Sequence, residues 1–188
     1  MAKIKTRLDR PPLTVPVCLV GANVNGKPNF EAIAWFNLVD YDPYMISVAS
    51  GKSHYTNEGI RQNKTFSINI PSADMVVVTD YCGTNSGAKV DKSKVFDVFY
   101  GELKTAPMIK ECPVNVECKL AQTTETLHDE LFIWEITGVY MEEKCLTDAK
   151  PDIRKIDPLI FEEGLGNYWR IGEHIAKAFT IGKNYKTK

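Results

Sequence analysis

The stretch LTVPVCLVGANVNGKPNF, residues 13–30, decides the fold class. Residues 13–22 are apolar and rich in β-branched side chains, which is typical of a β-strand. The pair Asn25-Gly26 that follows is a strong signal for a tight hairpin turn with positive backbone φ. The sequence therefore predicts that the chain turns back on itself here as an antiparallel hairpin.

More strands are expected along the rest of the chain. The returning strand is predicted over residues 31–39, before Asp42-Pro43, a pair that favours a turn. Residues 44–49 follow as a third strand. Residues 66–70 alternate apolar and polar side chains and stop at Pro71, which cannot donate to a strand ladder. Two long strands are predicted at residues 114–122 and 131–141, joined by a polar connection that contains His128.

The expected helices are few. Thr56 is predicted to cap a helix that runs to Gln62, and Ser72 a second helix that ends near Tyr81. Residues 83–94 are rich in Gly, Ser, Asn and Lys, so they predict a surface loop with a short helix near its end. The charged, proline-containing residues 148–158 suggest an extended excursion. Apolar residues recur about one helical turn apart over residues 168–179, which predicts a terminal helix.

This succession of short-linked strands favours a small closed or split barrel over a parallel doubly wound sheet. The chain has 188 residues with 44% hydrophobic content, enough for one sizeable core, so residues 1–188 are expected to form a single domain. The 23 basic residues balance the 24 acidic ones and leave a net charge of -1. That balance argues against general attraction to nucleic acid or anionic membranes.

Targeting, disulfide and metal signals are weak. The sequence has no run of about 18 apolar residues and no apolar core of a signal peptide near its start, so we expect a cytoplasmic protein. Five cysteines without a C-x-x-C pair predict reduced thiols, and three dispersed histidines make a metal centre an unfavoured interpretation.

One polar segment, SGKSHYT at residues 50–56, combines a glycine, three aliphatic hydroxyls, a lysine and a helix start. Backbone N–H groups at a helix N-terminus point toward an anion, and Lys52 adds a mobile positive charge, so the segment suits a phosphate monoester. It lacks the earlier glycine of a P-loop. The alternative interpretation is an ordinary polar turn before a capped helix.

A second candidate group contains Asn29 and the stretch Ala34-Trp35-Phe36. A flavin ring needs an aromatic or apolar wall and polar groups at its edge, which Trp35 and Asn29 could provide. The alternatives are that Trp35 belongs to the core and that Asn29 is a turn residue.

The third group is SGAKVDK, residues 86–92, in which Lys89 and Lys92 stand beside the Ser86-Gly87 turn. A cation near the pyrimidine end of a flavin would stabilise the negative charge that develops there on reduction. The alternative is a pair of solvated surface lysines. Cys82 precedes this loop and could approach a ligand, although a buried structural thiol is the commoner outcome.

Taken together, these groups resemble the flavin-reductase-like, FMN-binding split-barrel family, and within it the flavoredoxin group. The likeness covers nearly the whole chain, and the order and spacing of the motifs carry it. Beyond the groups above, it includes Ala106-Pro107, Glu117-Cys118, His128, Tyr168 and Gly172-Glu173.

The resemblance implies a mainly β fold with flanking helices, a Greek-key split β-barrel, and a homodimer with FMN in a groove near the subunit interface. It implies that the turn around Thr56 holds the phosphate and that Trp35 lies beside the ring. Many flavin reductases carry an arginine in this turn, whereas Lys52 binds phosphate without a bidentate fork. The implied flavin-binding residues are Asn29, Ala34, Trp35, Phe36, Ser50, Lys52, Ser53, His54, Thr56, Ser86, Gly87, Lys92, His128 and Phe161.

The function that the resemblance implies is electron transfer through non-covalently bound FMN, with NAD(P)H or a reduced protein as donor. No G-x-G-x-x-G follows a strand, so a dinucleotide-binding domain is missing and a flavoredoxin-like role is favoured over NAD(P)H:flavin oxidoreductase. A non-redox dimeric binding module is a further alternative. An oligonucleotide-binding barrel is disfavoured by the neutral charge.

Overall fold

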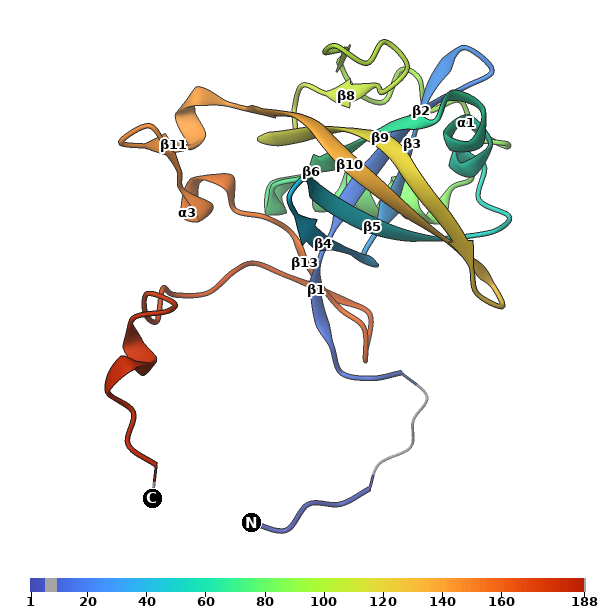
Figure 1. Ribbon diagram of the computed structural model, residues 1–188. Helices are drawn as coiled ribbons and strands as arrows, with labels where there is room; N and C mark the ends of the chain where they lie inside the picture. Colours follow the sequence, from blue (N-terminus) through green and yellow to red (C-terminus); the bar gives the residue numbers. More distant parts are fainter. Residues whose placement is uncertain (6–9, 188) are drawn as a thin grey trace.

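One curled antiparallel sheet organises the protein in this computed structural model, which describes residues 1–5 and 10–187 (Figure 1). Its strands are β2 (Cys18–Val24), β3 (Lys27–Ile33), β4 (Phe36–Tyr41), β5 (Tyr44–Gly51), β6 (Thr65–Ile70), β9 (Val114–Glu125) and β10 (Asp129–Met141). They lie in the order β3-β2-β6-β9-β10-β5-β4, and every neighbouring pair is antiparallel. The hairpins β2–β3, β4–β5 and β9–β10 are thus joined by pairs of strands that are not consecutive in the sequence. This topology confirms the mainly β, Greek-key split barrel.

The hairpin predicted at Asn25-Gly26 forms as expected. Asn25 and Gly26 have φ angles of 51° and 77°, so the turn needs the left-handed region that Asn and Gly tolerate best. Behind the turn, β2 is buried along almost its whole length because β3 and β6 flank it in the sheet.

The barrel interior is filled by side chains that alternate along the strands. Phe66 of β6 and Trp134 of β10 lie at its centre with ring centroids 4.2 Å apart, and Phe132 packs beside Trp134. A second apolar cluster around Leu19 and Phe30 lies under the segment that follows α2 (Val76–Thr84). The two clusters hold the sheet from both faces.

Two helices position the candidate site. Helix α1 (Thr56–Asn63) lies against β2, and α2 lies against β3. Gly59 allows the close approach of α1, because a Cβ at this position would lie 2.3 Å from Asn23 O. The 3₁₀ turn η1 (Ala73–Met75) precedes α2, so the helix predicted to begin after Ser72 is confirmed.

Small elements complete the chain. A three-stranded sheet with the order β1-β13-β14 lies below the barrel in Figure 1. The remaining elements are β1 (Thr14–Pro16), β7 (Val98–Phe99), β8 (Met108–Ile109), η2 (Glu143–Cys145), β11 (Leu146–Thr147), β12 (Lys150–Pro151), α3 (Ile153–Ile156), β13 (Ile160–Glu162), β14 (Asn167–Trp169) and η3 (Ile181–Asn184). The excursion expected at residues 148–158 therefore contains β12 and α3.

Two local predictions near the first strands were wrong. The strand expected over residues 31–39 is divided at Ala34-Trp35, because the Trp35 carbonyl accepts a hydrogen bond from Ala49 N at 2.9 Å where the chain bends toward β5. Thr56 is the first residue of α1, and the N-cap position belongs to Tyr55.

The terminal helix predicted over residues 168–179 is also wrong. Tyr168 lies in β14, residues 170–176 form no regular element, and the short η3 begins only at Ile181. The loop at residues 83–94 contains turns in place of the short helix expected there. Within residues 1–5 and 10–187, no helix combines the length and apolarity needed to cross a membrane.

Candidate functional site

The candidate site lies where the two ends of the curled sheet approach each other. Strand β3 ends one side of the sheet and β5 lies near the other, and their side chains meet: Ser50 Oγ is 2.9 Å from Glu31 Oε1. The same hydroxyl is 2.8 Å from Asn57 Oδ1 on α1. Glu31, Ser50 and Asn57 are all buried, so side chains close the barrel at this point.

A cleft of about 330 Å³ opens beside this contact. A second cavity of about 320 Å³ adjoins it and shares Tyr55, Gly87 and Lys92 with it. The cleft is lined by Glu31, Ala32, Ser53, His54, Tyr55, Thr56, Cys82, Gly83, Thr84, Asn85, Ser86, Gly87 and Lys92. Its volume falls within the range of small-molecule sites, roughly 300 to 1,000 Å³.

The start of α1 forms one end of the cleft. The side chain of Asn29 donates from Nδ2 to Thr56 Oγ1 at 2.7 Å, and both residues are buried. Thr56 therefore keeps its own hydroxyl proton for another acceptor in the cleft. Gly87 packs so tightly here that a Cβ would lie 2.0 Å from Asn29 Oδ1. Asn29, Thr56 and Gly87 thus form a shaped polar corner at a helix N-terminus, which suits an anion.

A charged cluster behind the cleft fixes the preceding turn. Asn57 Nδ2 donates to Gly51 O and to Glu130 Oε2, each at 3.0 Å. Arg61 Nε donates to Glu130 Oε1 at 2.9 Å, and an Arg61 guanidinium nitrogen donates to Lys52 O at 3.2 Å. The hydrogen bond from Arg61 holds the pKa of the Glu130 carboxyl below its ordinary value. This cluster ties the turn at residues 50–54 to both α1 and β10.

His54, the last residue of the turn at residues 50–54, lines the cleft. Its Nδ1 lies 3.3 Å from Glu31 Oε2 and 3.2 Å from Ser50 Oγ. The hydrogen bond with Glu31 raises the pKa of His54, although partial burial opposes that shift. A positive charge on His54 is therefore favoured beside the polar corner.

Lys92 brings a second cation to the cleft from the far side. Its side chain is only 3% exposed, and Nζ donates to Phe30 O at 2.9 Å and to Cys82 O at 2.8 Å. Burial lowers the pKa of this ammonium group. The solvated-lysine alternative is therefore wrong for Lys92, whereas Lys89 is exposed. Burial also raises the pKa of the Cys82 thiol to about 11, so Cys82 contacts the cleft as a neutral group.

The structure brings seven of the fourteen sequence-predicted residues to the cleft or its polar corner. Six of them line the cleft directly, and Asn29 contacts Thr56 at its edge. The six are Ser53, His54, Thr56, Ser86, Gly87 and Lys92. Ser50 lies directly behind the cleft, where it contacts His54. The candidate phosphate turn and the Ser86–Lys92 loop, far apart in the sequence, thus face the same space.

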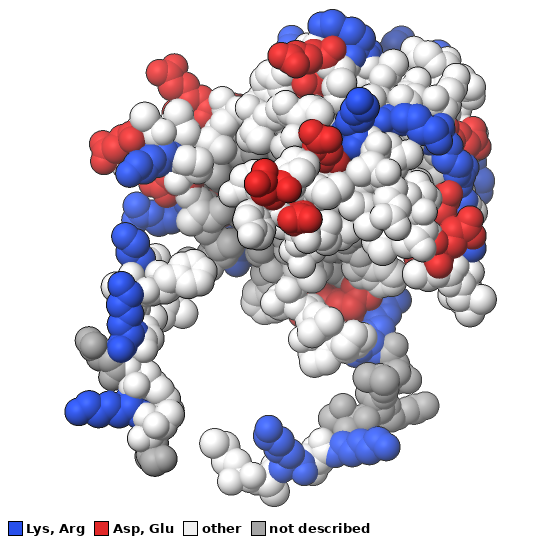
Figure 2. Space-filling model, in the orientation of Figure 1, with Lys and Arg blue, Asp and Glu red and all other residues white. Residues whose placement is uncertain are grey.

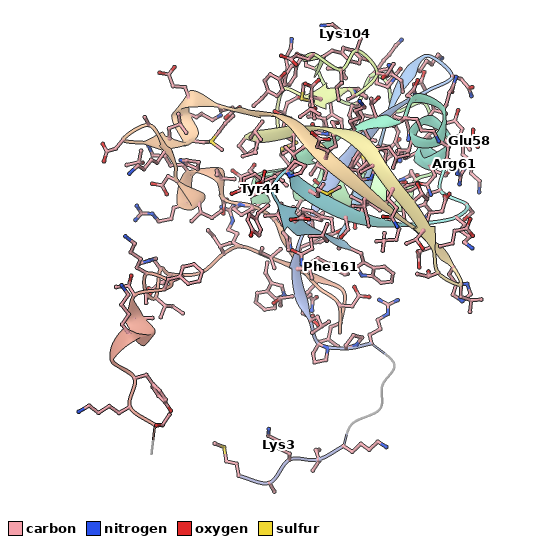
Figure 3. All side chains as sticks on the ribbon, in the orientation of Figure 1. Lys3, Tyr44, Glu58, Arg61, Lys104 and Phe161 are labelled. Atoms are coloured by element: carbon pink, nitrogen blue, oxygen red, sulfur yellow. The ribbon has the colours of Figure 1, made fainter. Side chains whose placement is uncertain are left out.

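The other predicted residues lie outside this cleft. Lys52 Nζ pairs with Glu125 at 2.8 Å, and its backbone N–H donates to His128 O at the tip of the β9–β10 hairpin. Phe161 packs against Tyr168 with ring centroids 5.6 Å apart. Figure 3 shows Phe161 below the barrel, well separated from Arg61 on α1.

The three residues Ala34-Trp35-Phe36, where β3 gives way to β4, differ in how deeply they are buried. Phe36 packs against the barrel core, and Ala34 is half-buried. Trp35 is 52% exposed, so the alternative that it belongs to the core is wrong. Its indole is available to a ligand or to another protein surface.

Sequence reasoning missed Glu31, Asn57, Arg61 and Glu130. Glu31 had a usable signal, because residues two apart in a strand share a face and Glu31 stands two residues after Asn29. The contact between α1 and Glu130 depends on the register of β10 against β5, in which Glu130 lies opposite Ser50. Local sequence patterns do not contain that register.

The cleft can therefore hold an anionic group against the start of α1 and a polar, planar group along Ala32, Gly83 and Lys92. The cationic side chains at opposite sides, His54 and Lys92, favour a ligand that carries or develops negative charge. The residues present fit a phosphorylated flavin, since they combine a helix N-terminus, a glycine-shaped corner and a buried lysine.

Comparisons with known proteins also find flavin-related proteins. The model of the flavin reductase like domain matches residues 10–164. The crystal structure of a flavoredoxin from Methanosarcina acetivorans has 48% identity and a TM-score of 0.94, with 97% of this chain and 98% of that chain covered. The flavoredoxin of Desulfovibrio vulgaris (Miyazaki F) has 38% identity and a TM-score of 0.87, with 96% of this chain and 100% of that chain covered.

A curated relative, an uncharacterized protein of Archaeoglobus fulgidus, is 33% identical over 129 residues, which cover 68% of this chain and 72% of that protein. The matched domain model spans most of the chain, including β2 to β10 and the whole cleft. The chain therefore belongs to the flavin reductase like domain family.

Proposed function

We propose that this protein binds FMN without a covalent link in the cleft between α1 and the Ser86–Lys92 loop, and passes electrons through it. The observation that carries this proposal is the polar corner made by Asn29, Thr56 and Gly87 at the N-terminus of α1. It offers one compact anion site, which matches a terminal phosphate monoester.

The chain's own residues would act by binding and orienting the cofactor. Thr56 at the N-terminus of α1 would hold the phosphate, while His54 would add positive charge near it. Lys92 would lie along the ring edge, where its charge favours the reduced, anionic form. Bound FMN would supply the redox chemistry, because flavins accept and release electrons without a catalytic side chain.

An electron-transfer role of the flavoredoxin type is favoured by the two flavoredoxin structures that match 96% and 97% of this chain. NAD(P)H:flavin oxidoreductase activity is the second candidate, supported by the family to which the chain belongs. The donor is then either a reduced protein or NAD(P)H bound transiently at the open side of the cleft.

We also propose a homodimer. Trp35 is half-exposed at the break between β3 and β4, and β4 beyond it shows exposed apolar residues on both faces. Such a strand at the edge of a sheet needs cover. A second copy of the chain would bury it and enclose the aromatic side of the site.

A visible spectrum and a set of titrations test the cofactor proposal. Purified protein incubated with FMN and desalted should keep a flavin absorption band near about 450 nm. Titration of the apoprotein should give tighter binding of FMN than of riboflavin, since only FMN presents a phosphate to Thr56. A colourless protein that retains no added flavin would support the non-redox binding module instead.

A further inference from the structure

The last part of the chain forms an arm that leaves the body. We define the C-terminal arm as residues 170–187. Figure 1 shows it running away from the barrel after the hairpin of β13 and β14. Two of its apolar side chains are almost fully exposed: Ile175 is 93% exposed and Phe179 is 96% exposed. Ile181 and Tyr185 are exposed as well.

Specific contacts hold the base of the arm. The Arg170 guanidinium pairs with Asp74 beside α2 and with Asp157 after α3. His174 lines a shallow cavity with Ile153 and its neighbours. Beyond His174, the hydrogen bonds of the described residues stay within the arm, as between Ile181 N and Lys177 O. The base is thus fixed to the body while the apolar end projects from it.

The likeness to a relative extends into the arm. The Methanosarcina acetivorans flavoredoxin structure covers 97% of this chain at a TM-score of 0.94. An apolar segment that projects from the body into water gains free energy when it packs on a surface.

The same chain offers such a surface. We define the β4 strip as Trp35, Leu38, Val39, Tyr41 and Tyr44, all of them exposed. It lies on the edge strand of the sheet and around the β4–β5 turn, where Tyr44 is labelled in Figure 3. Exposed apolar residues on an edge strand are typical of an interaction surface.

The C-terminal arm and the surroundings of the β4 strip also carry opposite charges. The arm contains Arg170, Lys177, Lys183 and Lys186 against the single acid Glu173. Figure 2 shows basic side chains spaced along this part of the chain. Two exposed acids adjoin the β4 strip: Asp40 in β4 and Asp42 in the β4–β5 turn. Opposite charges favour pairing of the two surfaces and fix its register.

From these observations we infer that the C-terminal arm of one subunit packs on the β4 strip of a second copy of the chain, and that the two copies exchange arms. The arm contributes apolar anchors around Ile175 and Phe179, and lysines contact the acids at the β4–β5 turn. Since Trp35 belongs to the strip and adjoins β3 of the cleft, the partner's arm then helps to enclose the flavin side of the barrel. This inference rests on the homodimer proposed above.

A photocross-linking experiment tests it on the full chain. Phe179 is replaced by p-benzoylphenylalanine, and Leu127, at the exposed tip of the β9–β10 hairpin, is replaced in a matched control. Irradiation of the Phe179 variant should give a covalent dimer, with the cross-link in a peptide that spans residues 35–45 of the other chain. The Leu127 variant should give no cross-link to that peptide. Cross-links of Phe179 within its own chain, or to another region only, would overturn the inference.

Sedimentation velocity supplies an independent readout. A chain that ends at Glu173 keeps the Arg170 contacts but loses the apolar end of the arm, so its dimer dissociation constant should rise at least about tenfold. Leu38→Ser in the full chain should weaken the dimer in the same direction, and Leu127→Ser should leave it unchanged. An unaltered dissociation constant in the truncated chain, or a monomeric full chain, would refute arm exchange.

Flavin absorbance recorded on the same samples separates the two proposals. Cross-linking to residues 35–45 in a colourless protein would support arm exchange and reject the cofactor proposal. Retained FMN with a monomeric protein would reject arm exchange and leave the cofactor proposal standing. A Phe179 cross-link that forms only when anionic vesicles or another protein is added would mean a different occupant for the arm and would overturn the inference.

Discussion

Replacing Thr56 by valine separates the phosphate contact from the ring contacts. Valine keeps the shape of threonine but removes the hydroxyl whose proton is available to the cleft. Because Oγ1 now accepts a hydrogen bond from Asn29 at 2.7 Å, the change also removes that acceptor. Two separate effects follow, one on FMN affinity and one on stability.

Their sizes follow from the contacts. A hydrogen bond to a charged phosphate is worth about 1.5–3 kcal/mol, which lowers FMN affinity about 10- to 150-fold in Thr56→Val. The unsatisfied amide of buried Asn29 costs about 1–3 kcal/mol of folding free energy. For a domain of this size, each kcal/mol lowers Tm by about 2–4 °C. Riboflavin lacks the phosphate, so its affinity should stay nearly constant.

Fluorescence titration of apoprotein with FMN and with riboflavin measures the first effect, and thermal unfolding of the apoprotein measures the second. Thr56→Ser keeps the hydroxyl and serves as the matched control, with FMN affinity close to that of the natural protein. Equal losses for FMN and riboflavin in Thr56→Val would refute the phosphate role, as would an unchanged FMN affinity.

Other substitutions test the rest of the cleft. Gly87→Ala should weaken FMN binding at least about tenfold, because its Cβ would displace the Asn29 side chain, whereas Gly172→Ala has open space around it and should bind FMN normally; titration distinguishes them. The pKa of His54 is raised above its ordinary value of 6.5 in the folded protein. Protonated His54 therefore stabilises the fold fully at pH values below 6.5, and this stabilisation is lost as the pH rises through the raised pKa. Denaturant unfolding measures the free energy of unfolding at about pH 5.5 and at about pH 8.5. Between these two pH values, the natural protein should lose more of this free energy than His54→Asn does. Equal losses would exclude the His54–Glu31 contact as a source of stability.

Local sequence patterns predicted the barrel, and seven of the fourteen residues named from the sequence lie at the cleft or its polar corner. Hairpin signals such as Asn25-Gly26 act over a few residues, and the phosphate turn is a contiguous segment with a helix directly after it. The cluster around Glu130 was missed because it depends on which strands pair, and that is decided by packing across the whole sheet. The sequence named Lys92 as a candidate, and the structure shows that it lines the cleft and donates to two buried carbonyl groups.

The terminal helix failed for a physical reason that the arm explains. Apolar residues with helical spacing stabilise a helix mainly when that face packs against a surface, and short helices are marginal in water. The arm contacts its own body only near its base, and Ile175 and Phe179 are almost fully exposed, so periodicity alone was insufficient. The strand predicted over residues 31–39 failed because Trp35 O accepts a hydrogen bond from Ala49 N and the chain bends there.

The closure of the barrel through Ser50 and Glu31 has a consequence for how such proteins diversify. Elsewhere in the sheet, main-chain hydrogen bonds join the strands whatever the side chains are, but at this seam the contact is made by side chains such as Ser50 and Glu31. Substitutions along the seam therefore change the wall of the cleft without breaking a ladder of backbone bonds. The identity of a few side chains, and not the strand pairing, decides the shape and polarity of this opening.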